Sequence, residues 1–176
     1  MDRKDGKRAA QPAALTHRRN LGVILVLALL AAGVLGGCYP KRIGPPGADG
    51  KPLTWAEMNT EQRKAHMAAV VIPRAGAVFR AWRPERFARI DCTLCHGQGA
   101  VNGNFSMPTA HLPRLSGDLL LGPERAKYPD TTQLKLDRLV PEMADALGLK
   151  KFSLVTRRGF GCYSCHLGPE GPLFGN

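Results

Sequence analysis

One five-residue pattern occurs twice in this chain of 176 residues. The pattern is Cys-x-x-Cys-His, found at residues 92–96 and again at residues 162–166. The chain has five cysteines, so the two copies use every cysteine except Cys38. Residues three apart on a helical turn lie on one face, so the two thiols of each copy point the same way. Each copy therefore offers two thiols and an adjacent imidazole to a single partner.

This spacing matches the attachment sequence of c-type haem. Two thiols one helical turn apart can reach the two vinyl groups of one porphyrin, and the imidazole that follows can bind the iron from one face. We therefore expect two covalently attached haem c groups as the cofactors of this protein. The residues expected to hold them are Cys92, Cys95 and His96 for the first haem, and Cys162, Cys165 and His166 for the second.

Zinc and disulfide bonds are the alternative uses of these cysteines. Two Cys-x-x-Cys pairs could share one zinc ion, but the gap from Cys95 to Cys162 is far longer than in compact zinc ribbons. Zinc also leaves the histidine after each pair unexplained. Disulfides are permitted outside the cytoplasm, and a redox-active thiol pair of thioredoxin type would need alternating strands and helices, a pattern that this sequence lacks.

The N-terminus has the form of an export signal. Residues 1–20 are polar and basic, residues 21–35 form an apolar run, and Gly36-Gly37 precede Cys38. The apolar run is shorter than the roughly 20 residues that cross a bilayer as a helix, so the segment predicts a secretory signal peptide. The cysteine after the cut resembles that of a bacterial lipobox, which predicts lipidation of Cys38. An uncleaved signal anchor is the alternative, and both place the remaining chain outside the cytoplasm.

The chain divides into three expected parts. Residues 1–37 are the signal peptide of lipoprotein type, and residues 38–53 are a lipid-anchored flexible spacer with too few collagen-like triplets for a triple helix. Residues 54–176 are of a length typical of one domain, here the dihaem domain. We expect it on the periplasmic side of a bacterial membrane, and the sequence does not distinguish the inner from the outer membrane.

Helical patterns dominate this domain. A cap at residues 59–60 begins an amphipathic helix that reaches residue 82, with Pro73 marking a kink or a restart. A second amphipathic segment runs over residues 134–147 and contains Pro141. The two prolines stand 19 and 21 residues before the first cysteine of each motif, a spacing that a duplicated unit would explain. The expected fold class is mainly α, a small multihaem cytochrome c with short helices and extensive loops around two covalent haems.

Three motifs carry a resemblance to a known group of proteins. From Trp55 to the second motif, the chain resembles small dihaem c-type cytochromes found as lipoproteins in Gram-negative bacteria. The resemblance implies a protein of that fold with two haems. The residues that carry it are Cys92-Thr93-Leu94-Cys95-His96-Gly97, Phe105-Ser106-Met107-Pro108 and Gly159-Phe160-Gly161-Cys162.

A second axial side chain is needed to complete the coordination of each iron. Met107 precedes a proline on a loop after the first motif and resembles the distal methionine of class I cytochromes c. It lies only 11 residues beyond His96, closer than in that class, so the loop would have to curl tightly. The other candidates, each of which could instead be a core or surface residue, are His66, Met67, His111 and Met143.

The charge favours an acidic partner. The net charge is +11, and the chain from Cys38 onward has 19 Lys and Arg against 12 Asp and Glu. The bases are scattered, and no basic and aromatic array is present, so nucleic acid is not an expected partner. We expect the membrane as a partner through lipid on Cys38, together with redox proteins that carry acidic surfaces.

Electron transfer is the expected function, and two alternatives compete with it. Two haems tuned by ligands, burial and charge can carry electrons without any substrate chemistry, so we expect no enzymatic activity. A small haem enzyme of peroxidase or reductase type would need acid–base groups beside an open iron, and Asp91 and Glu170 are the nearest acids to the motifs. A haem sensor or a subunit of a larger respiratory complex is the other alternative.

Overall fold

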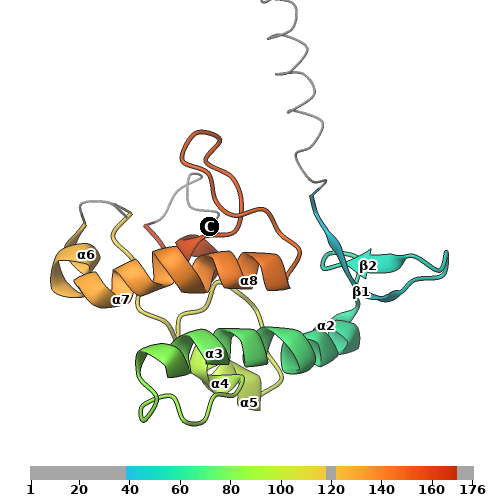
Figure 1. Cartoon of the computed structure of the whole chain (residues 1–176), viewed down its shortest axis with the longest axis horizontal. Coiled ribbons are helices and arrows are strands. Elements are labelled where there is room, and N and C mark those ends of the chain that lie inside the picture. The colour runs from blue at the N-terminus through green and yellow to red at the C-terminus, as the bar shows by residue number, and fades with distance from the viewer. Residues whose placement is uncertain (1–38, 118–121, 170–176) are drawn as a thin grey trace, which may run out of the picture. The chain divides into compact units, whose positions relative to one another are not determined.

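The computed structural model describes residues 39–117 and 122–169. The expected signal peptide and the lipidation site Cys38 lie outside these residues. In the described part of the chain, no helix is both long enough and apolar enough to span a membrane. Helices make up most of the regular structure, together with one small sheet and long loops (Figure 1). At this level the fold is the mainly helical one expected.

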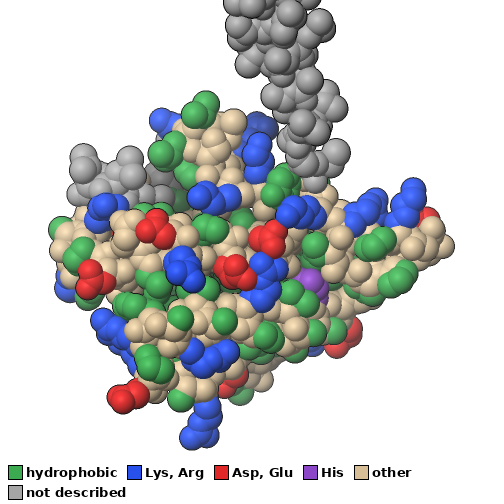
Figure 2. Space-filling view, in the orientation of Figure 1, with side chains coloured by type: hydrophobic (Ala, Val, Ile, Leu, Met, Phe, Trp, Pro, Cys, Tyr) green, Lys and Arg blue, Asp and Glu red, His purple; other side chains and the backbone are tan. Residues whose placement is uncertain are grey.

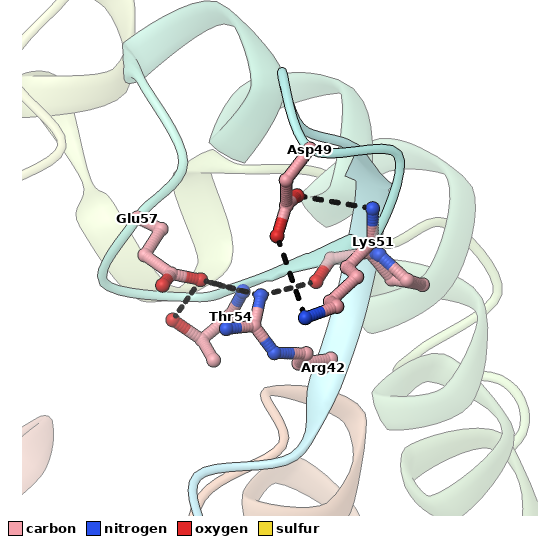
Figure 3. Close-up of polar contacts among 6 residues, drawn as sticks. Arg42, Asp49, Lys51, Thr54 and Glu57 are labelled. Carbon is pink, nitrogen blue, oxygen red and sulfur yellow. Dashed lines mark hydrogen bonds and ion pairs between the residues drawn. The ribbon is translucent and has the colours of Figure 1, made fainter.

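A β-hairpin begins the described chain. Strand β1 (Arg42–Pro46) pairs in antiparallel fashion with β2 (Pro52–Thr54). Lys51 closes the turn, since its backbone N–H donates to Oδ1 of Asp49 at 3.0 Å (Figure 3). Prolines are tolerated in both strands because each has an open edge that needs no ladder hydrogen bond.

One carboxylate ties this hairpin to the chain that follows. Oε2 of Glu57 accepts hydrogen bonds from the backbone N–H and the hydroxyl of Thr54, at 2.8 and 2.9 Å, and from Arg42 at 3.3 Å (Figure 3). These bonds to Thr54, with Arg42 adding a smaller effect, lower the pKa of Glu57. Residues 42–53 of the expected spacer thus lie in this hairpin.

A long helix in three consecutive parts follows the hairpin. It consists of α2 (Thr60–His66), a π-helical turn η1 (Met67–Val71) and α3 (Ile72–Trp82). Asn59 caps it as predicted, because its side chain accepts from the N–H of Gln62 while the Gln62 side chain accepts from the N–H of Asn59, both at 2.9 Å. The bounds agree with the helix predicted for residues 60–82.

The second long helix has the same three-part construction. It consists of α7 (Pro129–Leu134), the π-helical turn η2 (Lys135–Leu139) and α8 (Val140–Ala146). It begins five residues earlier than the predicted segment, with a proline in its first turn, where the missing N–H costs no hydrogen bond. It stops at Gly148, whose φ of 64° suits a residue without a side chain.

The two π-helical turns stand in the same register. In each, the residue before the proline donates its N–H to the carbonyl five residues earlier, Ile72 to Met67 and Val140 to Lys135. A proline in a helix lacks an N–H, and its ring clashes with the carbonyl four residues back, so a wider turn makes room for it. This shared register extends the proline alignment that a duplicated unit would explain.

Helices α3 and α8 lie side by side and run antiparallel (Figure 1). Arg74 on α3 joins them by ion pairs with Glu142 and, at 2.8 Å, with Asp145 on α8. Beneath these pairs lies a buried apolar cluster of Val71, Ala144, Ala146, Leu147 and Phe160. The remaining helical pieces are the short α4 (Thr93–His96), α5 (Gln98–Val101), α6 (Pro123–Lys127) and the 3-10 turn η3 (Cys162–Ser164).

Candidate haem-attachment site

The first Cys-x-x-Cys-His motif forms a single helical turn that starts with a local cap. The N–H of His96 donates to the carbonyl of Cys92 at 3.0 Å, which closes the turn. Oδ1 of Asp91 accepts from the backbone N–H of Thr93 at 2.8 Å and from its hydroxyl at 2.6 Å. These two bonds lower the pKa of the exposed Asp91 carboxyl. The cap is encoded locally, because an Asp two residues before a helix N–H is a common way to begin a turn.

The second motif closes in the same way. The N–H of His166 donates to the carbonyl of Cys162 at 2.9 Å, the bond that corresponds to the one in the first motif. Here the turn is a 3-10 helix, and the N–H of Gly161 donates to Oγ of Ser164 at 3.0 Å. Both motifs therefore bring two cysteines and a histidine together by backbone geometry alone.

A loop that follows the first motif runs along the second one. We call residues 104–117 the crossing loop. The N–H of Thr109 donates to the carbonyl of Cys165 at 3.1 Å, and the N–H of Leu115 donates to the carbonyl of Leu167 at 2.8 Å. The loop that follows the first motif is thus bonded through its main chain to the second motif, which lies about 70 residues after the first in the sequence.

The crossing loop also contacts both imidazoles. The ring of Phe105 meets that of His96 edge to face, with 5.4 Å between the ring centroids. The Nδ1 of His166 donates to the carbonyl oxygen of Pro113 at 2.8 Å, while the buried Nδ1 of His96 has no hydrogen-bond partner among the described residues. A histidine that binds a metal through one nitrogen commonly donates from the other to a carbonyl. His166 is therefore held with its Nε2 available to a metal.

Burial keeps both imidazoles in the form that binds metals. It lowers the pKa of His96, and it lowers the pKa of His166 against the opposing effect of the bond to Pro113. A lower pKa favours the neutral ring at neutral pH, and only the neutral ring has a free nitrogen lone pair.

The four described cysteines are free thiols of intermediate exposure. Burial raises the pKa of Cys95 and of Cys162. Burial, together with the charges of Cys95 and Cys162, raises the pKa of Cys165 to about 12. That electrostatic coupling between Cys95 and Cys165 arises because the two motifs are close in space. The ammonium of Lys135 on η2 acts in the opposite direction on all three thiols.

These thiol properties differ from those of the alternative sites. A redox-active thiol pair relies on a lowered pKa, and here the pKa values of three of the four thiols are raised. A zinc ion shared by the two pairs would need at least three side chains around one point. Within residues 39–117 and 122–169, no group of three or more His, Cys, Asp or Glu side chains is gathered to hold a metal ion.

The candidate distal ligands fall into two groups. Met107 lies half-buried in the crossing loop, and His111 in the same loop lies against Gly97, directly after the first motif. The other three belong to the helices. His66 is buried and its Nε2 donates to the carbonyl of Ala146 at 2.8 Å. Half-buried in the packing around the apolar cluster are Met67 and Met143.

Two hollows lie away from the motifs. One, of about 520 Å³, is lined by residues of β1, α2 and η1, including Ile43 and Val70. The other, of about 170 Å³, lies between α3 and the second long helix and is lined by Trp82 and Leu134 among others. Neither is lined by a cysteine or histidine of the two motifs, so the motif geometry and not a preformed hollow identifies the site.

Three contributors to the site were missed by sequence reasoning. Pro113 acts through its backbone carbonyl, which every residue type has, so no sequence signal could identify it. Lys135 lies on a different long helix, 40 residues from Cys95 in the sequence. Phe105 was noted only as part of a motif. An aromatic residue nine positions after His96 was the one available hint to its role.

Comparisons with known proteins add no relative. No family model matches the sequence, and neither the curated proteins nor the solved structures contain a significant match.

Proposed function

We propose that this chain is a periplasmic, lipid-anchored electron carrier with two covalently bound haem c groups, a small multihaem cytochrome c. The observation that supports it best is the occurrence of two Cys-x-x-Cys-His turns, each closed by a hydrogen bond from the histidine N–H to the carbonyl of the first cysteine, with one crossing loop between them. Haem bound at each turn would supply an iron that takes up and releases a single electron.

The residues present fit this cofactor. Each turn has free thiols for thioether bonds and a neutral imidazole for the iron, and His166 has the carbonyl partner typical of a metal-binding histidine. A covalent porphyrin would also supply apolar surface to a described core that is small, since ten hydrophobic residues are buried.

The protein's own part is to hold and to tune the two irons. The crossing loop orients His166 through Pro113 and contacts His96 through Phe105, so one segment controls the ring positions at both sites. Lys135 places a positive charge near thiols of both motifs. Proximity of the motifs would allow electrons to pass from one iron to the other within the chain.

Haem stoichiometry tests the proposal directly. The full chain is produced in a host that attaches c-haems, and haem is counted by pyridine haemochrome and by intact mass. We expect two haems per chain, and one haem after Cys92→Ala with Cys95→Ala or after Cys162→Ala with Cys165→Ala. Thr93→Ser is the matched control, since it lies between the first two cysteines and keeps a hydroxyl for Asp91; it should retain both haems.

The same mass measurement reports on the lipid. A mature chain that begins at Cys38 with added acyl mass supports anchoring, and an unmodified cysteine contradicts it. A wild-type chain with no covalent haem would contradict the carrier itself.

A further inference from the structure

A projecting loop precedes the second motif. Residues 150–160, which we call the basic finger, fold back on themselves above α8 (Figure 1). The N–H of Phe160 donates to the carbonyl of Lys150 at 2.8 Å, and the N–H of Ser153 donates to the carbonyl of Arg158 at 3.0 Å. These bonds give the finger a defined root and a defined tip.

The finger is apolar at both ends, but only its root is buried. Phe160 is 9% exposed and belongs to the buried apolar cluster. At the tip, Leu154 is 67% exposed and Val155 is 93% exposed. Burying two aliphatic side chains would be favourable, so a tip that leaves them in water is typical of a surface that meets a partner.

Positive charge surrounds this tip. The exposed bases of the finger are Lys150, Lys151, Arg157 and Arg158, and residues 149–161 contain no Asp or Glu. Among the described residues, none of the four bases forms an ion pair with a carboxylate. Figure 2 shows hydrophobic side chains at the end of the projection with Lys and Arg side chains around it. An apolar tip ringed by bases suits an anionic lipid surface.

The start of the described chain lies at the base of the finger. The N–H of Lys41 donates to the carbonyl of Gly148 at 2.7 Å, and Gly148 is two residues before the finger begins. A Cβ on Gly148 would lie 2.6 Å from the carbonyl oxygen of Lys41, so the two segments touch. Tyr39, 45% exposed, directly follows Cys38 in the sequence. The first described residues, which follow the expected lipid site in the sequence, therefore lie against the base of the finger.

We propose that the basic finger docks on the anionic surface of the membrane, with Leu154 and Val155 inserted among the lipids and the four bases on the phosphate groups. This inference rests on the lipid anchor proposed at Cys38, which would hold the finger near the bilayer. The finger leads directly to Cys162, so docking would place the second motif nearer the membrane than the first. The lipid anchor would then attach the protein to the membrane, and the finger would set the orientation of the protein on it.

Lysine reactivity within one molecule tests this docking. The full mature chain is reconstituted in phosphatidylcholine vesicles containing phosphatidylglycerol, in pure phosphatidylcholine vesicles and in detergent. Acetylation of each lysine by an amine-reactive reagent is followed by mass spectrometry. On the anionic vesicles, Lys150 and Lys151 should react at least about fivefold more slowly than in detergent. Lys64 on α2 and Lys127 on α6 are internal controls and should react equally in both.

A pair of variants separates the effect of inserting the finger tip among the lipids from other effects of substitution. Leu154→Ser with Val155→Ser should abolish most of the protection, while the vesicles still carry the protein on flotation. Val101→Ser is the matched control, because Val101 is 66% exposed but lies on α5, outside the finger. It should leave the protection unchanged.

The outcomes distinguish this inference from the proposed function. A chain that does not float with vesicles overturns both the lipid anchor and the docking. A chain that floats, but whose Lys150 and Lys151 react equally in vesicles and detergent, overturns the docking alone. If polyglutamate protects these lysines and anionic vesicles do not, the finger is a protein-docking surface and the membrane assignment is wrong.

Discussion

The Nδ1 of His166 donates a hydrogen bond to the carbonyl oxygen of Pro113, which lies 53 residues earlier in the chain and 2.8 Å away. Pro113 belongs to the crossing loop, which begins shortly after the first Cys-x-x-Cys-His motif. A change in that loop therefore reaches the imidazole of the second motif.

Gly97 is predicted to be intolerant of a side chain. Its φ is 56°, and a Cβ there would lie 2.3 Å from Cγ of His111. Gly97→Ala should lower the free energy of unfolding by roughly 1–3 kcal/mol from backbone strain, with a steric cost in addition. Urea denaturation of the haem-loaded protein measures this.

Two further variants separate the cost of backbone strain from the cost of the steric clash with His111. Gly103→Ala is the matched control, since Gly103 has a φ of 76° but nothing within 4 Å of a Cβ, so it should show strain alone. Adding His111→Ala to Gly97→Ala should recover part of the steric cost and none of the backbone strain, since the Cβ of residue 111 would remain 2.8 Å from the added one. A Gly97→Ala protein as stable as the wild type would contradict the close contact between His111 and the first motif.

Lys135 is predicted to raise the reduction potential of both haems. Its ammonium acts on Cys95 of the first motif and on Cys162 and Cys165 of the second. A positive charge favours the reduced iron, so Lys135→Gln should lower both midpoint potentials in a spectroelectrochemical titration. Lys127→Gln, on α6, removes an equal charge and should shift them less. A Lys135→Gln shift confined to one haem would contradict a cation shared by both motifs.

Met107 is predicted to be a distal iron ligand, in contrast to His66. Met107 lies in the crossing loop, two residues before Thr109, which bonds to the second motif. The Nε2 of His66 is already bonded to Ala146. Met107→Ala should remove the weak far-red absorption band of sulfur-ligated ferric haem. His66→Gln, which keeps an amide donor for Ala146, should leave that band intact, and persistence of the band after Met107→Ala would point to Met67 or Met143.

Asp145 is predicted to stabilise the fold in a pH-dependent way. Hydrogen bonds from Lys41 and Arg74 lower its pKa. A carboxyl whose folded pKa lies below its unfolded value of about 3.9 stabilises the fold above that value. This stabilisation is lost as the pH falls through the folded pKa.

Substitution of Asp145 tests this dependence. The side chain is 48% exposed, so solvent screening limits its contribution, and Asp145→Asn should cost about 0.5–1 kcal/mol at neutral pH. The difference from wild type should shrink at pH values below about 4, as measured by urea denaturation. A difference between Asp145→Asn and wild type that is constant with pH would argue against the ion pairs.

Local sequence is enough to specify the two Cys-x-x-Cys-His turns, the cap at Asn59 and the helix that it begins. Each depends on bonds between residues no more than five apart, such as those from His96 to Cys92 and from Gln62 to Asn59. Such short-range hydrogen bonds can be predicted because the sequence gives both the residue types and their spacing.

The arrangement of the two motifs relative to each other depends on contacts between distant segments. The carbonyl of Pro113, the charge of Lys135 and the pairing of Lys41 with Gly148 join segments at least 27 residues apart. Every residue has a backbone carbonyl, so the sequence does not indicate which one will accept a hydrogen bond from a distant histidine. Packing decides which groups lie near a charged side chain, so the thiols near Lys135 could not be predicted from the sequence either.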